Sequence, residues 1–266
     1  MFRENQDDVT TVDKTNLQPI LQYGESSILG TRSMQQDSLL TMTNSSFFAA
    51  VVCDGMGGLE SGEVASRTAT ARFQKDFMKL TAGDEIAEFL HEEAAVLDEE
   101  VYELKTEAGE FLDAGTTIVS VIICQNQLHW MSAGDSKIYF IREGELSSLT
   151  REHNYRLSLD ILKRRGMISA EDYISESEKG EALISYLGMG NLSLIDGNRE
   201  AIDLERGDMI LLCSDGLYKS MSEEEILEIM LKYKNLQKMA VALTDFVTAK
   251  GMASQDNTSV IVLRYA

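Results

Sequence analysis

The chain has 266 residues, and 44% of them are hydrophobic, so it can bury a sizeable core and is not expected to be disordered. Its formal net charge of -20 argues against binding to nucleic acid or to an anionic membrane, because both carry negative charge. The sequence contains no run of about 18 apolar residues, so no membrane-spanning helix is expected. It contains three cysteines without metal-type spacing, which predicts a reducing, cytoplasmic environment.

The chain begins with a stretch that differs from the rest. Residues 1–17 are polar and have no hydrophobic period, which predicts a flexible leader before a single domain at residues 18–266. The first strand is expected to start at residues 20–23, and residues 24–30 predict a turn after it. A further strand is expected at residues 39–42.

The most informative stretch runs from Phe47 to Gly58, where an apolar run ends in an acid and then in glycines. A long apolar run bounded by turn residues predicts a strand that is buried on both faces, with Asp54 at its end. The glycines would let the backbone approach whatever that carboxylate binds, because they have no Cβ. The same Asp-Gly pair is also the commonest hairpin dipeptide, so this stretch taken alone favours a β-turn.

Two helices are predicted next, at residues 61–80 and 84–106, because their apolar residues keep the helical period. Many acids lie between residues 88 and 110. We expect them on solvated helix faces, where they would account for much of the negative charge without any function of their own.

A group of strands follows these helices. The β-branched run at residues 115–124 predicts a central strand. Turn residues then separate it from runs at residues 128–132 and 138–141, which together predict an antiparallel meander.

The segment at about residues 150–190 is polar and charged, and it interrupts the strands. A segment of this length is typical of a lid or a binding loop. Strands are expected to resume at residues 199–204 and 209–212. A capping box at residues 222–225 predicts a helix, Asn235 predicts the start of another, and the chain closes in a strand.

Five aspartates share one kind of position, at the margin of a predicted strand. They are Asp37, Asp54, Asp135, Asp215 and Asp256. Carboxylate oxygens suit hard divalent cations such as Mg²⁺ and Mn²⁺. Each acid alone is compatible with a turn, and it is their combination that indicates a metal cluster.

Six short motifs, taken in order, resemble those of the metal-dependent protein phosphatase family, the protein phosphatase 2C type. They are Arg32-x-x-x-Gln36-Asp37, Asp54-Gly55-Met56-Gly57-Gly58, Gly115-Thr116-Thr117, Gly134-Asp135-Ser136, Ser214-Asp215-Gly216 and Asp256-Asn257. The resemblance covers residues 20–264. It implies an α+β fold, a two-sheet antiparallel β-sandwich flanked by helices on both sides (αββα). It also implies similarity to bacterial members, in which the segment at 150–190 is a mobile flap beside the site.

The resemblance implies a role for each matched acid at a pair of Mn²⁺ or Mg²⁺ ions. Asp54 would bridge the two ions, and Gly55 would donate its backbone carbonyl to one of them. Asp215 and Asp256 would complete the first ion, and Asp37 would hold waters on the second.

A third ion and the substrate phosphate are implied by the same resemblance. Asp135, with Asp215 shared, would bind a third and weaker ion. Arg32 would contact the substrate phosphate, which suits a guanidinium fork.

Four positions depart from the family. Gln35 stands where Asn is usual and Lys137 where Arg is frequent, and the other two bear on the chemistry. Gln36 stands where Glu is frequent, which predicts weaker metal affinity, and Met56 stands where many eukaryotic members have a histidine proposed as general acid.

The implied activity is that of a serine/threonine protein phosphatase, which hydrolyses phosphoserine and phosphothreonine without a phosphoenzyme. Attack by a water that bridges the two cations is expected, because two cations can lower the pKa of such a water and clamp the phosphoryl oxygens. The expected partners are phosphoproteins and a cognate serine/threonine kinase, with no nucleic acid and no membrane, and a monomer is expected. Two alternatives stay open, a catalytically silent phosphatase-like scaffold and a metal-dependent hydrolase of small phosphoesters.

Overall fold

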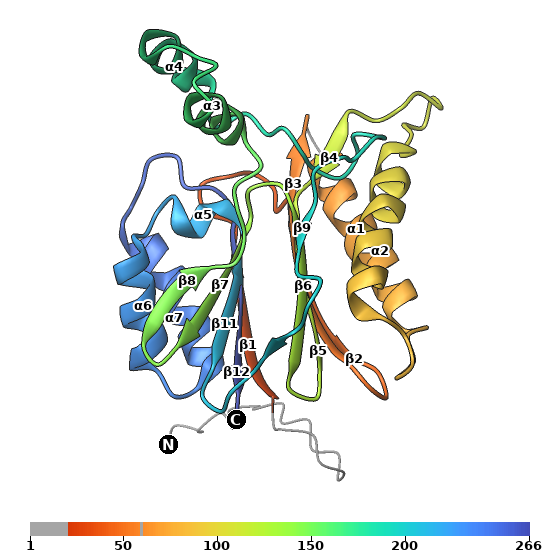
Figure 1. Cartoon of the computed structure of the whole chain (residues 1–266), viewed down its shortest axis with the longest axis vertical. Coiled ribbons are helices and arrows are strands. Elements are labelled where there is room, and N and C mark those ends of the chain that lie inside the picture. Colours follow the sequence, from red (N-terminus) through yellow and green to blue (C-terminus); the bar gives the residue numbers. More distant parts are fainter. Residues whose placement is uncertain (1–20, 59–60) are drawn as a thin grey trace.

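The computed structural model describes residues 21–58 and 61–266, so the predicted leader at 1–17 and the start of the predicted domain at 18 lie outside the described residues. Two antiparallel sheets face each other, and helices cover the outer face of each sheet (Figure 1). The predicted αββα sandwich is therefore confirmed. Within the described residues, no helix has both the length and the apolar character needed to cross a membrane.

One sheet contains both the first strand of the described chain and the last. Its strand order is β1-β12-β11-β7-β8. The bounds are Leu21–Ile28 for β1, Thr258–Tyr265 for β12, Met209–Cys213 for β11, Lys137–Arg142 for β7 and Glu145–Ser148 for β8. The central strands β11 and β12 are almost wholly buried, in keeping with their continuous apolar runs.

The other sheet has the order β10-β6-β5-β3-β2, with β4 paired to β3 and β9 paired to β6. The bounds are Ile202–Asp203 for β10, Gln127–Ala133 for β6, Ile118–Cys124 for β5, Phe48–Gly57 for β3, Asp37–Thr43 for β2, Ala114–Thr116 for β4 and Asp196–Gly197 for β9. Strand β3 is buried on both faces, as predicted. Ala50 and Val52 pack between the two sheets, whereas Val51 and Cys53 pack in the core on the helical side.

Two pairs of long helices form the outer layers (Figure 1). They are α1 at Ser61–Phe77 and α2 at Ile86–Tyr102 on one side, and α6 at Glu223–Lys232 and α7 at Leu236–Ala249 on the other. The predicted capping box is present, because Ser222 accepts from the Glu225 N–H and the Glu225 side chain accepts from the Ser222 N–H. Asn235 caps α7 by accepting the Lys238 N–H at 2.8 Å.

Between α2 and the flap, the predicted meander is wrong. Strand β6 pairs with β5 in one sheet, whereas β7 pairs with β11 in the other. The chain therefore crosses from one sheet to the other at Gly134 and Asp135. Gly134 has a φ of 107°, which a residue with a Cβ rarely adopts, so the sharp change of direction depends on this glycine.

Two other sequence-based expectations are corrected. The turn expected at residues 24–30 is largely strand, because β1 continues to Ile28. Gly24 lies within it for another reason, since a Cβ there would come 2.4 Å from the backbone of Leu236 at the start of α7. The acids of α2 are not all solvated, because Glu93 and Asp98 are both buried.

The segment at 150–190 carries two helices that project beyond the sandwich at the end where β3 and β4 lie (Figure 1). Helix α3 spans Tyr155–Arg164 and helix α4 spans Ala170–Glu176. The segment expected to be a flap thus stands beside one end of the two sheets, and its mobility stays a prediction.

Candidate active site

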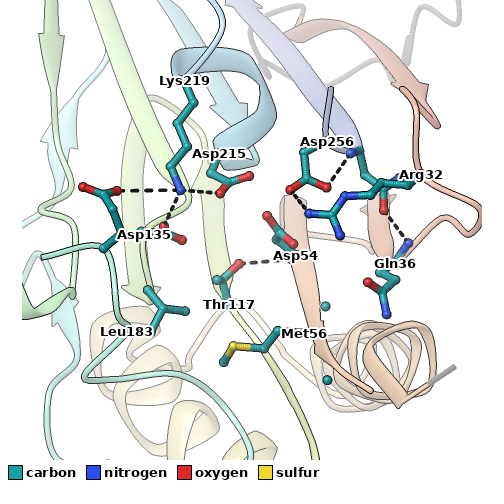
Figure 2. Close-up of a pocket in the computed structure, with 14 residues that line it drawn as sticks. Arg32, Gln36, Asp54, Met56, Thr117, Asp135, Leu183, Asp215, Lys219 and Asp256 are labelled. Carbon is teal, nitrogen blue, oxygen red and sulfur yellow. Dashed lines mark hydrogen bonds and ion pairs between the residues drawn. The ribbon is translucent and has the colours of Figure 1, made fainter. Parts of the chain in front are cut away.

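Strand register brings the predicted acids to one end of the sandwich. Asp37 at the start of β2 pairs directly with Asp54 in β3. Asp215 follows β11 as the first residue of the short helix α5 (Asp215–Tyr218), and Asp256 comes just before β12. Asp135 lies at the crossing between the sheets. Four of these five aspartates therefore line one pocket (Figure 2), and Asp37 lies next to it through its pairing with Asp54.

The pocket has a volume of about 280 Å³ and a mostly polar lining. Besides the four acids, it is lined by residues of four of the predicted motifs, by two residues of the flap segment and by Lys219. These are Arg32, Gln36, Gly55, Met56, Gly57, Thr117, Glu181, Leu183, Lys219 and Asn257. The structure thus brings together the residues singled out from the sequence, while their assignment as ligands stays a prediction.

The backbone of Asp54 is held by the threonines at 116 and 117. Its N–H donates to Thr117 Oγ1 at 3.0 Å, and its carbonyl accepts from the Thr117 N–H at 2.8 Å and from Thr116 Oγ1 at 3.0 Å. Thr117 Oγ1 also lies 2.7 Å from Ser136 Oγ, next to Asp135. The two threonines therefore fix the position from which the Asp54 side chain enters the pocket.

Gly55 allows a close approach between β3 and the start of α1. A Cβ at this position would lie 2.0 Å from the carbonyl oxygen of Gly62 and 2.6 Å from that of Gln36. The glycine was expected to admit a bound group, and the structure adds a second reason, the approach of two backbone segments. Its N–H donates to the Gln36 carbonyl at 3.0 Å.

Asn257 positions the loop that carries Arg32 and Gln36. Its side-chain oxygen accepts the Gln36 N–H at 2.8 Å, and its amide nitrogen donates to the carbonyls of Leu29 and Met34 at 2.9 and 3.1 Å. Sequence reasoning had matched Asn257 as part of a motif but had given it no role. It is a positioning residue that connects this loop to the start of β12.

The carboxylates carry an excess of negative charge that the protein only partly balances. Burial, together with the charges of Asp215 and Asp256, raises the pKa of Asp37 to about 6, against the effect of hydrogen bonds from serines. Burial also raises the pKa of Asp135 to about 6, and it raises that of Asp54 well above its usual value. Such a cluster favours the binding of a cation, which would relieve the repulsion.

Two buried oxygens support the same conclusion. Asp37 Oδ1 and Asp215 Oδ1 have no hydrogen-bond partner among the described residues. The other oxygen of Asp37 accepts from Ser214 Oγ at 2.8 Å. A buried carboxylate oxygen without a donor is costly, and a divalent cation is the natural partner for it. The residues present therefore fit a site for hard cations.

Two cationic side chains already contact these acids. Arg32 Nη2 lies 2.5 Å from Asp256 Oδ2 at the rim, and Lys219 Nζ lies 2.6 Å from Asp215 Oδ2 (Figure 2). In the part of the chain that the structure describes, no three acidic, cysteine or histidine side chains are gathered closely enough to hold one ion as they stand. Asp256 and Arg32 would have to separate for both to take their predicted roles.

Lys219 was missed by sequence reasoning. Burial alone would lower its pKa, but the carboxylates of Asp215, Asp135 and Glu181 raise it overall. The signal that could have found it is its spacing, because Lys219 follows Asp215 by four residues, one helical turn.

Comparisons with known proteins identify the family of this chain. A family model described as protein phosphatase 2C matches residues 26–255. The serine/threonine phosphatase stp of Listeria monocytogenes is 30% identical over 217 residues, which cover 80% of this chain and 82% of that protein.

Solved structures are similar as well. A serine/threonine phosphatase of S. agalactiae superposes with a TM-score of 0.80 at 23% identity, covering 92% of this chain and 100% of that one. The catalytic domain of the phosphatase PstP, in complex with two manganese ions, superposes with a TM-score of 0.70 at 27% identity, covering 92% of this chain and 97% of that one.

Proposed function

Because this chain belongs to the protein phosphatase 2C family and is a metal-dependent serine/threonine phosphatase, we propose that its reaction takes place in the pocket around Asp54. The observation that carries the proposal is the meeting of Asp54, Asp135, Asp215 and Asp256 in one pocket with Arg32 at its rim. These residues come from five separate parts of the chain, and only the fold brings them together.

The carboxylates are proposed to hold two Mn²⁺ or Mg²⁺ ions. Asp54, the carbonyl of Gly55, Asp215 and Asp256 would be ligands of the two ions. Asp37, beside the pocket, would bind an ion indirectly, through water. When bound, such ions supply an activated water and neutralise charge on the phosphoryl group. The partnerless oxygens of Asp37 and Asp215 support this assignment, as does the manganese complex of the relative PstP.

The other pocket residues bind and orient the substrate in this proposal. Arg32 is half exposed, and its guanidinium can turn from Asp256 to make two parallel hydrogen bonds to a phosphate. Met56 has no proton to donate, and none of the three histidines, all of which the structure describes, lines the pocket. Neither Met56 nor a histidine can therefore protonate the leaving oxygen, and water that enters the open pocket is the proposed proton source.

The biological setting is proposed on separate grounds. The relatives are named as serine/threonine phosphatases. We infer that this chain acts as a monomer on proteins phosphorylated by a serine/threonine kinase of the same cell. The cytoplasm is the proposed location, because Cys53, Cys124 and Cys213 are all free thiols.

The proposed function is tested by phosphate release from a phosphothreonine peptide, measured with Mn²⁺ and then with EDTA. We expect activity only with the metal. The variants Asp54→Asn and Asp215→Asn should each lose at least about 100-fold in kcat/KM, because several kcal/mol of charge stabilisation correspond to two or more powers of ten. Asp245→Asn, an exposed acid of α7 outside the pocket, is the matched control and should behave like the wild type.

Each alternative has its own outcome in this assay. A silent scaffold would release no phosphate from any substrate. A hydrolase of small phosphoesters would cleave p-nitrophenyl phosphate but not the peptide. Turnover by Asp54→Asn at the wild-type rate would show that the pocket around Asp54 is not where the reaction takes place.

A further inference from the structure

Lys219 brings a fixed positive charge into the acidic pocket. It follows the short helix α5, and its side chain reaches the space between Asp135 and Asp215 (Figure 2). Its Nζ lies 2.6 Å from Asp215 Oδ2, 3.5 Å from Asp135 Oδ2 and 3.9 Å from Glu181 Oε2. One ammonium group is thus surrounded by three carboxylates, two from the sandwich and one from the flap segment.

These contacts differ from those of an ordinary surface ion pair. The side chain of Asp135 is 8% exposed and that of Asp215 is 16% exposed, whereas that of Lys219 is 41% exposed. Exposed pairs contribute little because water and salt screen them. Here the two acids are largely withdrawn from water, so their repulsion needs a cation close by.

The ammonium group lies between the two acids that the family resemblance implies for a third ion. By that resemblance, Asp135 together with Asp215 would bind a third, weaker cation. A lysine ammonium is a compact point charge with three donors, and it already contacts one oxygen of each acid. The second oxygen of Asp215, Oδ1, has no partner among the described residues and stays available to the main cation site.

We propose that Lys219 takes the place of a third divalent cation, so that the enzyme binds two metal ions and balances the Asp135–Asp215 pair with its own side chain. The inference rests on the cation site of the proposed function. It also gives the flap segment a contact that does not depend on metal concentration, because Glu181 reaches both Lys219 and Arg156 of α3.

The test counts Mn²⁺ ions by equilibrium dialysis with metal analysis, over a rising concentration of free Mn²⁺. We expect the wild type to saturate at two ions. Lys219→Met removes the charge and keeps the length of the side chain, and it should bind a third ion at a free Mn²⁺ concentration at least about tenfold below the highest at which the wild type still holds only two. Adding Asp135→Asn to this variant should remove the third ion again.

Controls separate this inference from a general effect of charge. Lys179→Met removes a lysine of the flap segment that pairs with Glu176, and it should bind two ions like the wild type. Lys219→Gln is a second variant in case Lys219→Met does not fold, as judged by circular dichroism. The count on the wild type needs no variant at all.

Three outcomes would overturn the proposal. A third ion on the wild type, lost in Asp135→Asn, would show that Lys219 does not fill the position, while leaving the two-ion site intact. If the wild type and both Lys219 variants each bound two ions, Lys219 would not be what keeps a third ion from binding. A wild type that binds no ion would overturn the proposed cation site itself, and this inference with it.

Discussion

Glu93 on helix α2 allows a quantitative prediction that is independent of the active site. Its side chain faces the core and is 4% exposed, and its Oε1 has no hydrogen-bond partner among the described residues. Burial, together with the nearby Asp76, raises the pKa of this carboxyl from 4.5 to about 7, although Arg72 and Lys79 act in the opposite direction.

The expected effect on the free energy of unfolding follows from linkage. Below pH 4.5 the group is neutral in both the folded and the unfolded state, so it costs nothing. As the pH rises from 4.5 to about 7, the unfolded state ionises freely while the folded state keeps its proton, so stability falls over this range. Above about 7 the folded state has to bury a charge, and the loss is complete. The difference between the two pKa values corresponds to a loss of up to about 3 kcal/mol of stability.

The substitution Glu93→Gln keeps the shape of the side chain and removes its titration. We expect this variant to be more stable than the wild type by up to about 3 kcal/mol at pH 8, with most of the gain lost at pH 5. Urea unfolding in EDTA at both pH values measures the difference, and Glu92→Gln, an exposed neighbour on α2, is the control. An equal difference at pH 5 and pH 8 would refute the reasoning.

Three further predictions concern the site and its supports. Gly55→Ala should destabilise the protein by at least about 2 kcal/mol, because the new Cβ would meet the Gly62 carbonyl; an unchanged midpoint of urea unfolding would contradict this. Arg32→Lys should raise KM for a phosphothreonine peptide about tenfold with a smaller change in kcat, since an ammonium group cannot bind phosphate through two parallel bonds; an equal KM would argue against phosphate binding by Arg32. Asp98→Asn should cost about 2 kcal/mol or more, because four backbone N–H groups of residues 188–192 donate to this carboxylate; thermal unfolding at the wild-type temperature would disprove it.

Elements with strong local signals could be predicted from the sequence. Strand β3 combines an apolar run with clear boundaries, and it is buried on both faces as expected. Ser222 and Asn235 cap their helices as their chemistry indicates, because an N-cap depends on residues only three positions away. Local interactions determine these features, so no knowledge of the rest of the fold is needed.

Features that depend on distant partners could not be predicted in this way. The turn at Gly134 and Asp135 has the same local composition whether the next strand joins the same sheet or the opposite one. Gly24 has the composition of a turn, but its small size is needed against α7. The role of Asp98 depends on a loop about 90 residues away in the chain, as the separations of its hydrogen bonds record.

In the candidate site, too, local features could be predicted and long-range contacts could not. The five aspartates were found because each lies in a short motif, and the motif order was sufficient to identify the family. The contacts that hold these aspartates in place could not be predicted, because they join residues that are far apart in the chain. Thr117, Asn257 and Lys219 contact residues that precede them by 63, 221 and 84 positions. Sequence reasoning therefore identified the acids and missed the hydrogen bonds and ion pairs around them.

The division of the acids between the two sheets has a consequence for folding. Asp37 and Asp54 belong to one sheet, while Asp215 and Asp256 flank strands of the other. An intermediate with a single sheet formed would hold only half of the acids, and it could neither retain a metal ion pair nor turn over substrate. During refolding, recovered phosphatase activity should therefore report the docking of the two halves and not the formation of either half alone.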